Sequence, residues 1–257
     1  DKPFGVNLTI LPSITPPPYE EYAKAIVESG ITIVETAGQS PKLFMPGFNA
    51  AGVKVIHKCT SVRHALKAQE LGCAAVSVDG FECAGHPGED DVTNLVLLPA
   101  AKEKLTIPMV ASGGIGTGSQ LAACLALGAE GVNMGTRFVA TVEAPVHNNM
   151  KQAMVDARET DTTLIFRTLH NTARVFKNSI SEQVVDIESQ DGKTEFSDVQ
   201  PLVAGKRGLE ECIKQGNVDN GIWTAGQVIG LINDIPTCEA LLDTMMSEAE
   251  EILRKNI

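Results

Sequence analysis

Residues 108–138 of this chain read PMVASGGIGTGSQLAACLALGAEGVNMGTRF. Two glycine turns, at 113–118 and at 135, each follow a short apolar run, and a helical pattern at 120–127 separates them. This order of strand, glycine turn and helix is typical of a parallel β/α fold. In a β/α barrel the last two such turns hold a phosphate with backbone N–H groups, and glycine lets the phosphate approach the backbone closely. The stretch therefore predicts an α/β fold that binds a phosphorylated ligand.

The same alternation of apolar runs and helical patterns extends back to the start of the chain. Gly30, Gly72 and Gly128 each stand between a helical pattern and the next apolar run, which is the place of a glycine that ends a helix. The pattern predicts six strands, at residues 4–11, 31–36, 53–59, 74–79, 108–110 and 129–134, and helices at 19–29, 41–51, 62–71 and 120–127.

Six parallel strands leave two open sheet edges, whereas a TIM (β/α)8 barrel closes with eight strands. We therefore expect such a barrel, lacking its first two βα units of about 60 residues. The start at Asp1 rather than at a methionine fits this expectation. A doubly wound sheet of six strands is the alternative.

The second half of the chain has a different pattern. The sequence predicts that residues 1–140 form the barrel, as strands 3–8, and that residues 141–257 form an α-rich cap with C-terminal helices. Within the cap we expect helices at 144–157, 200–215, 223–232 and 238–255, and a short strand at 184–187.

Composition limits the kinds of partner. The formal net charge of -11 argues against a nucleic-acid surface, and no apolar run reaches the roughly 20 residues of a membrane span. The six cysteines are scattered without a CxxC pair, which indicates reduced thiols, no metal site and a cytoplasmic location. We therefore expect small-molecule substrates, and a homodimer is possible.

Chemistry in a β/α barrel lies at the carboxyl ends of the strands. His86 lies between Gly85 and Pro87, in a loop of restricted shape that follows the fourth strand, and its imidazole can exchange a proton near neutral pH. Lys58 ends the third strand and is a candidate for a phosphate or a ring carbonyl. Hydroxyl and amide groups at the ends of the first two strands come from Asn7, Thr9 and Thr36.

Other polar residues of these segments are given no catalytic role. Glu82, Glu89, Asp90 and Asp91 form an acidic loop, which is more often solvated than a magnesium site. His57 alternates with Lys58 along its strand, so we expect its ring to point away from the ligand.

Several motifs together resemble one family. DGFECAGHPGED, ASGGIGTG, NMGTRF, the opening FGVNLTILPS and the late GIWTAGQVIGLI are similar to the nitronate monooxygenase family, formerly called 2-nitropropane dioxygenases. The resemblance implies an FMN-dependent β/α-barrel oxidoreductase. It also implies that an FMN-contacting loop of the missing first βα unit is absent here.

The resemblance assigns roles to individual positions. His86 matches the active-site histidine of the family. The positions expected around the FMN ring and ribityl chain are Thr9, Lys58, Asp79, Ala84 and Gly85, and those expected around the phosphate are Gly113, Gly114, Ile115, Gly135 and Thr136.

The motif around the histidine leaves the substrate open. True nitronate monooxygenases usually read AGGHRG, whereas this chain reads AGHPGED, which looks like the NAD(P)H:quinone reductase branch. We therefore expect oxidation of alkyl nitronates with O2, or alternatively quinone reduction with NAD(P)H as co-substrate. A flavin-free sugar-phosphate enzyme and a non-catalytic fragment are more remote alternatives.

Overall fold

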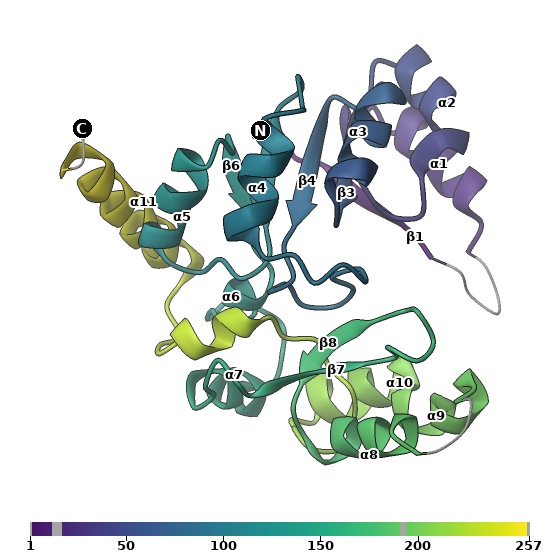
Figure 1. Ribbon diagram of the computed structural model, residues 1–257, viewed down its shortest axis with the longest axis vertical. Helices are drawn as coiled ribbons and strands as arrows, with labels where there is room; N and C mark the ends of the chain where they lie inside the picture. Colours follow the sequence, from purple (N-terminus) through teal and green to yellow (C-terminus); the bar gives the residue numbers. More distant parts are fainter. Residues whose placement is uncertain (1, 12–16, 191–193, 256–257) are drawn as a thin grey trace.

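The computed structural model describes residues 2–11, 17–190 and 194–255. Within these residues one parallel sheet contains six strands that lie side by side in chain order (Figure 1). The strands are β1 (Val6–Ile10), β2 (Ile33–Gly38), β3 (Lys54–Cys59), β4 (Ala75–Asp79), β5 (Met109–Ser112) and β6 (Gly131–Asn133). All six predicted strands are confirmed.

Helices connect consecutive strands, as parallel pairing requires. They are α1 (Tyr19–Glu28), α2 (Met45–Ala50) after a short 3-10 turn at Pro41–Leu43, α3 (Val62–Glu70), α4 (Asn94–Lys102) and α5 (Gly118–Ala126). The sequence pattern did not indicate α4. Gly30, Gly72 and Gly128 have φ of 75°, 87° and 99°, so each ends its helix in the left-handed conformation that favours glycine, as predicted.

The sheet is strongly curled. The side chain of Asn133 on β6 donates a hydrogen bond to Glu35 on β2 at 2.8 Å, although three strands separate β2 from β6 within the sheet. Asn7 on the opposite edge strand, β1, donates to the same carboxylate at 2.7 Å. Because both edge strands reach one side chain, the sheet encloses a polar interior as a barrel wall does.

Most of the second half of the chain, from α7 to α10, forms the lower part of Figure 1, below the sheet and its helices. A short helix, α6 (Thr136–Val139), leads to α7 (Asn148–Val155) and to an antiparallel hairpin of β7 (Thr162–Ile165) and β8 (Ala173–Phe176). The chain continues through α8 (Ser179–Glu188), α9 (Phe196–Val203), α10 (Gly205–Arg207), a π-helical segment at Gly208–Lys214 and a 3-10 segment at Gln227–Leu231, and ends in α11 (Cys238–Lys255).

Two expectations for this half are wrong. Residues 184–187 are helical, because the Asn178 side chain begins α8 with a capping box and Val184 is buried on one helical face. Residues 223–232 do not form one α-helix: residues 223–226 have no regular secondary structure, and Gln227–Leu231 form only a 3-10 segment. The helix expected at 200–215 is divided among three segments, and the helix at 238–255 is confirmed.

The last helix returns to the sheet. Leu241, Met245 and Ala249 of α11 are buried against Leu121 and Ala122 of α5, and the two helices lie together in Figure 1. The Glu248 side chain accepts a hydrogen bond from the backbone N–H of Gly118 at 3.0 Å, which places a negative charge at the N-terminus of α5. The domain boundary expected after residue 140 stays a prediction. In the described part of the chain, no helix is both long and apolar enough to cross a membrane.

Candidate active site

A cavity of about 940 Å³ opens at the carboxyl ends of β1 to β4. Parallel strands bring their carboxyl ends to one edge of the sheet, so residues far apart in sequence meet there. Six of the predicted site residues line this cavity: Thr9, Lys58, Asp79, Ala84, Gly85 and His86. The structure therefore brings together the positions expected around a flavin ring.

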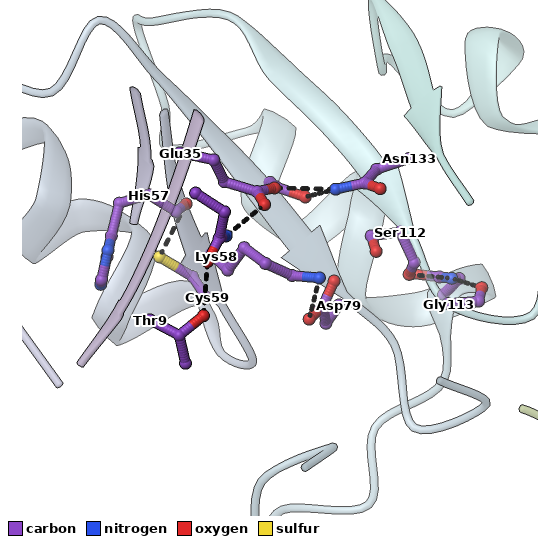
Figure 2. A network of polar contacts seen from close by, with 12 residues as sticks. Thr9, Glu35, His57, Lys58, Cys59, Asp79, Ser112, Gly113 and Asn133 are labelled. Atoms are coloured by element: carbon purple, nitrogen blue, oxygen red, sulfur yellow. Dashed lines mark hydrogen bonds and ion pairs between the residues drawn. The ribbon is translucent and has the colours of Figure 1, made fainter. Parts of the chain in front are cut away.

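An ion pair lies at the centre of the cavity (Figure 2). Lys58 Nζ lies 3.3 Å from Asp79 Oδ2. Burial opposes the charge of Lys58, but the carboxylates of Asp79 and Glu35 outweigh it and raise the pKa of the lysine. Burial raises the pKa of Asp79, against the attraction of Lys58. Asp79 Oδ1 is buried without a hydrogen-bond partner among the described residues, so this oxygen is left to accept a bond from a ligand.

Glu35 is a site residue that the sequence analysis did not identify. Its carboxylate lines the cavity and accepts hydrogen bonds from Asn7 and Asn133, while Thr9 donates to Asn7 (Figure 2 labels Thr9, Glu35 and Asn133). A charged residue inside the otherwise apolar run ITIVET was the available signal. Because Glu35 connects both edge strands, it supports the curvature on which the cavity depends.

The predicted phosphate-binding residues lie outside the lining of this cavity, at the ends of the neighbouring strands β5 and β6. Within the described residues, the backbone N–H groups of Gly114, Gly135 and Thr136 donate to no protein acceptor. A Cβ built on Gly135 would meet nothing within 4 Å, so the space beside the Cα of this residue is open. The site thus offers free N–H donors and a cradle that a side chain would fill.

Glycine is required for a different reason at positions 113 and 114. Both residues have positive φ, and an added Cβ would lie 2.7 Å from Cys83 and 2.6 Å from Glu82, respectively. Close packing of the loop after β4 therefore explains these two glycines, without a ligand. Steric access for a phosphate is therefore not needed to account for these two glycines, and the expectation that Gly113, Gly114 and Ile115 contact the phosphate stays a prediction.

The residues present fit FMN. The residues expected around the FMN ring and ribityl chain include a lysine, Lys58, and a buried acceptor without a partner among the described residues, Asp79 Oδ1. The residues expected around the phosphate supply backbone amides without a protein acceptor, and there is open space at Gly135. A phosphate at the end of a β/α strand is bound by such N–H groups.

The loop that carries His86 is held by the hairpin β7–β8. Gly85 and Arg174 exchange two backbone hydrogen bonds, of 2.6 and 3.0 Å, as an antiparallel bridge. The Arg174 guanidinium, which is 3% exposed, donates to the carbonyl oxygen of Phe81 at 3.0 and 3.3 Å and lies 4.6 Å from the centre of the Phe81 ring. The hairpin therefore fixes the start of the loop and the residue that precedes His86.

The acidic residues of this loop are mostly engaged in protein contacts. Glu89 accepts hydrogen bonds from Thr172, and Asp91 pairs with Arg167 at 2.8 Å. Glu82 accepts from the backbone N–H of Asn94 at the start of α4. These carboxylates fasten the loop rather than simply facing solvent.

His86 itself is exposed at the cavity. Partial burial of the imidazole ring lowers the pKa of His86, and the negative charge of Glu89 opposes this shift. The imidazole is therefore neutral at neutral pH and able to accept a proton.

Thr36 and His57 form a separate buried pair. Thr36 Oγ1 lies 2.8 Å from His57 Nδ1, and Thr36 is fully buried, so its hydroxyl is not available to a ligand in the cavity. Burial lowers the pKa of His57, and the bond to Thr36 opposes the shift.

This lowered pKa makes folding sensitive to acid. Above pH 6.5 His57 is neutral in both states, whereas below it the unfolded chain takes up a proton before the folded chain does. We expect the free energy of unfolding to fall between pH 7.5 and 5, and to fall less in a His57→Gln variant, as measured by urea unfolding. The exposed His64→Gln serves as the control. An equal loss in His57→Gln and the wild type would contradict the assignment.

Comparison with known proteins agrees with this geometry. The sequence model described as "Nitronate monooxygenase" matches residues 1–248 of the chain. The (3aS,4S,5R,7aS)-5-hydroxy-7a-methyl-1-oxo-octahydro-1H-indene-4-carboxyl-CoA dehydrogenase of Rhodococcus jostii is 29% identical over 282 residues, which cover 97% of this chain and 78% of that protein. The probable nitronate monooxygenase of Staphylococcus saprophyticus is 26% identical over 98% of this chain and 72% of its own length.

Solved structures show the same architecture. FabK from Thermotoga maritima superimposes with a TM-score of 0.90 at 31% identity, over 99% of this chain and 78% of that chain. A nitroalkane oxidase from Streptomyces ansochromogenes superimposes with a TM-score of 0.83 at 23% identity, over 100% of this chain and 83% of that chain. At this level of identity the likeness shows the fold alone. The expected α/β fold of the TIM-barrel type is confirmed.

Proposed function

The chain belongs to the nitronate monooxygenase family of flavin-dependent oxidoreductases, as the resemblance predicted, and on this premise we propose that it uses FMN to oxidise or reduce an acyl-CoA thioester. The likeness to the R. jostii indene-carboxyl-CoA dehydrogenase over 97% of the chain carries the proposal. A protein of the same name from Mycobacterium tuberculosis is 27% identical over 97% of the chain. The cavity of about 940 Å³ lies at the upper end of the size of small-molecule sites, which suits a bulky substrate.

The polar groups described above support a position for each part of the flavin. FMN supplies hydride transfer when it is bound. Lys58, kept protonated by Asp79 and Glu35, offers hydrogen-bond donors, and Asp79 Oδ1 offers an acceptor for the polar edge of the ring. The amides of Gly114, Gly135 and Thr136 would receive the phosphate.

His86 is proposed as the proton-exchanging residue. Hydride transfer to or from a carbon next to an oxygen or a thioester requires a proton to leave or arrive nearby. The neutral imidazole of His86 lines the same cavity as Lys58 and Asp79, and the hairpin holds the residue before it. It therefore can take up or return that proton.

We expect His86→Ala to lower kcat about 100-fold while FMN stays bound, because general acid–base catalysis contributes roughly 100- to 10,000-fold. In the wild type, kcat/KM should hold from neutral pH to below pH 6.5 and fall only when the imidazole becomes protonated. This fall of kcat/KM at acid pH should be absent in His86→Gln. Loss of flavin from His86→Ala would instead mean that the histidine is structural.

Nitronate oxidation with O2 is the second candidate. The family match and the S. saprophyticus relative favour it, and a nitronate is an anion that Lys58 would attract. Quinone reduction with NAD(P)H, which the AGHPGED motif favoured, stays a third prediction.

One set of assays separates the three activities. The flavin-loaded protein is mixed anaerobically with an acyl-CoA series, with propyl nitronate, and with NADPH followed by a benzoquinone. The proposal predicts that an acyl-CoA, saturated or unsaturated, changes the absorbance of the oxidised or pre-reduced flavin fastest. A response to propyl nitronate and none to any acyl-CoA would replace it with the second candidate.

A further inference from the structure

Basic side chains of α3 line the outer part of the active-site cavity and have no part in the reaction proposed above. Arg63, His64 and Lys67 contribute to the lining, and all three are exposed. A second hollow of about 610 Å³ shares these residues and adds Lys104. In a chain with a net charge of -11, this is a local concentration of positive charge beside the active site.

Local structure explains how the cluster reaches the cavity. β3 delivers Lys58 to the centre of the cavity and ends at Cys59, and the Ser61 side chain then caps α3 by accepting from the backbone N–H of His64. Arg63 and Lys67 are four residues apart, so they lie on one face of the helix. One continuous cavity therefore connects the reaction centre with this face.

Arg63 differs from the other arginines of the described chain. Each of the others donates to a carboxylate, carbonyl or hydroxyl oxygen: Arg137, Arg158, Arg167, Arg174, Arg207 and Arg254. Arg63 Nη2 lies 3.4 Å from Nε2 of the His64 ring, and the described residues give its guanidinium no oxygen acceptor. A guanidinium has five N–H donors in a geometry that matches phosphate oxygens.

The surrounding charges favour an anion on the α3 side. Lys67 pairs with Glu70 of its own helix at 2.9 Å, while Glu89 and Asp90 line the opposite loop. Repulsion from that loop and attraction to Arg63 would both direct an anionic group toward α3. The FMN phosphate is proposed to lie at the ends of β5 and β6, so a phosphate at Arg63 would belong to a second ligand.

We infer that Arg63, with His64 and Lys67, binds the adenosine diphosphate tail of the substrate while its reactive end lies at Lys58 and Asp79. The choice of coenzyme A as the carrier of that tail rests on the proposed function. A nicotinamide dinucleotide carries the same diphosphate, so both ligands are tested.

The experiment is calorimetric titration of the flavin-loaded full chain with coenzyme A, with pantetheine, which lacks the tail, and with NADPH. In Arg63→Ala we expect the Kd of coenzyme A to rise about tenfold, as for the loss of a charge-assisted phosphate contact, with pantetheine binding and flavin content unchanged. The control is Arg254→Ala, which removes an arginine of similar exposure on α11 and should bind like the wild type.

Each outcome of the titrations either supports or overturns the proposed binding site. If Arg63→Ala raises the Kd of NADPH alone, the result supports the site and assigns it to the dinucleotide. Unchanged Kd values for both ligands in Arg63→Ala, or loss of flavin from this variant, would overturn it. If coenzyme A binding depends on Arg63 but no acyl-CoA reacts with the flavin, the binding site stands and the proposed function fails.

Discussion

Gly135→Val is expected to abolish FMN binding while leaving the fold intact. The φ of Gly135 is -115° and a Cβ there meets nothing within 4 Å, so the protein itself tolerates a side chain. The valine branch would occupy the open space in front of the amides of Gly135 and Thr136, where the phosphate is proposed to lie. Loss of about two such hydrogen bonds, roughly 1.5 kcal/mol each, weakens binding at least about 100-fold.

The measurement is the FMN content of the purified protein and its Kd after reconstitution, with circular dichroism as the test of folding. Gly131→Val is a matched control, because an added Cβ at Gly131 also meets nothing within 4 Å, but Gly131 begins β6, whereas Gly135 follows the end of this strand. Flavin should be retained in that variant. Stoichiometric FMN in folded Gly135→Val would refute the phosphate assignment.

Arg174→Ala is expected to lower the free energy of unfolding by about 3 kcal/mol and to reduce kcat at least about tenfold. The substitution leaves the carbonyl oxygen of Phe81 and the hydroxyl of Thr162 without their buried donor and removes the contact with the Phe81 ring. The backbone bridge to Gly85 stays, so the loop is expected to loosen at Phe81 and to let His86 move.

Urea unfolding and steady-state kinetics test this prediction. Arg167→Ala is the control, since Arg167 is 41% exposed, pairs with Asp91 at the surface and lies farther from the Phe81 ring, at 5.9 Å. Such surface pairs contribute less than about 1 kcal/mol. Arg174→Lys should recover part of the stability but not the double hydrogen bond to Phe81. Equal stability of Arg174→Ala and Arg167→Ala would show that the hairpin does not hold the loop through this side chain.

The first half of the fold followed from local signals. β-branched runs, helical patterns and the helix-ending glycines at 30, 72 and 128 located all six strands, and strand ends placed Lys58, Asp79 and His86 in one cavity. These predictions depend on periodicity and on parallel topology, which are carried by residues close together in sequence.

The second half could not be predicted in the same way. Residues 184–187 have the composition of a strand and form a helix, because capping by Asn178 and burial of Val184 override local preference. The sequence of the hairpin β7–β8 contains no motif that indicates a role in the site. The hairpin affects the site because it contacts the loop at residues 81–91.

By itself the sequence predicted the parallel α/β architecture, the family and six of the residues that line the cavity. Only the tertiary structure showed that Glu35 joins both edge strands, that Arg174 holds the loop at residues 81–91, and that Arg63 has no oxygen acceptor among the described residues. It also showed that a side chain at position 113 or 114 would collide with Cys83 or Glu82, respectively. These features depend on contacts between residues 28 to 98 positions apart, or on the acceptors that surround a side chain, and no local pattern encodes either one.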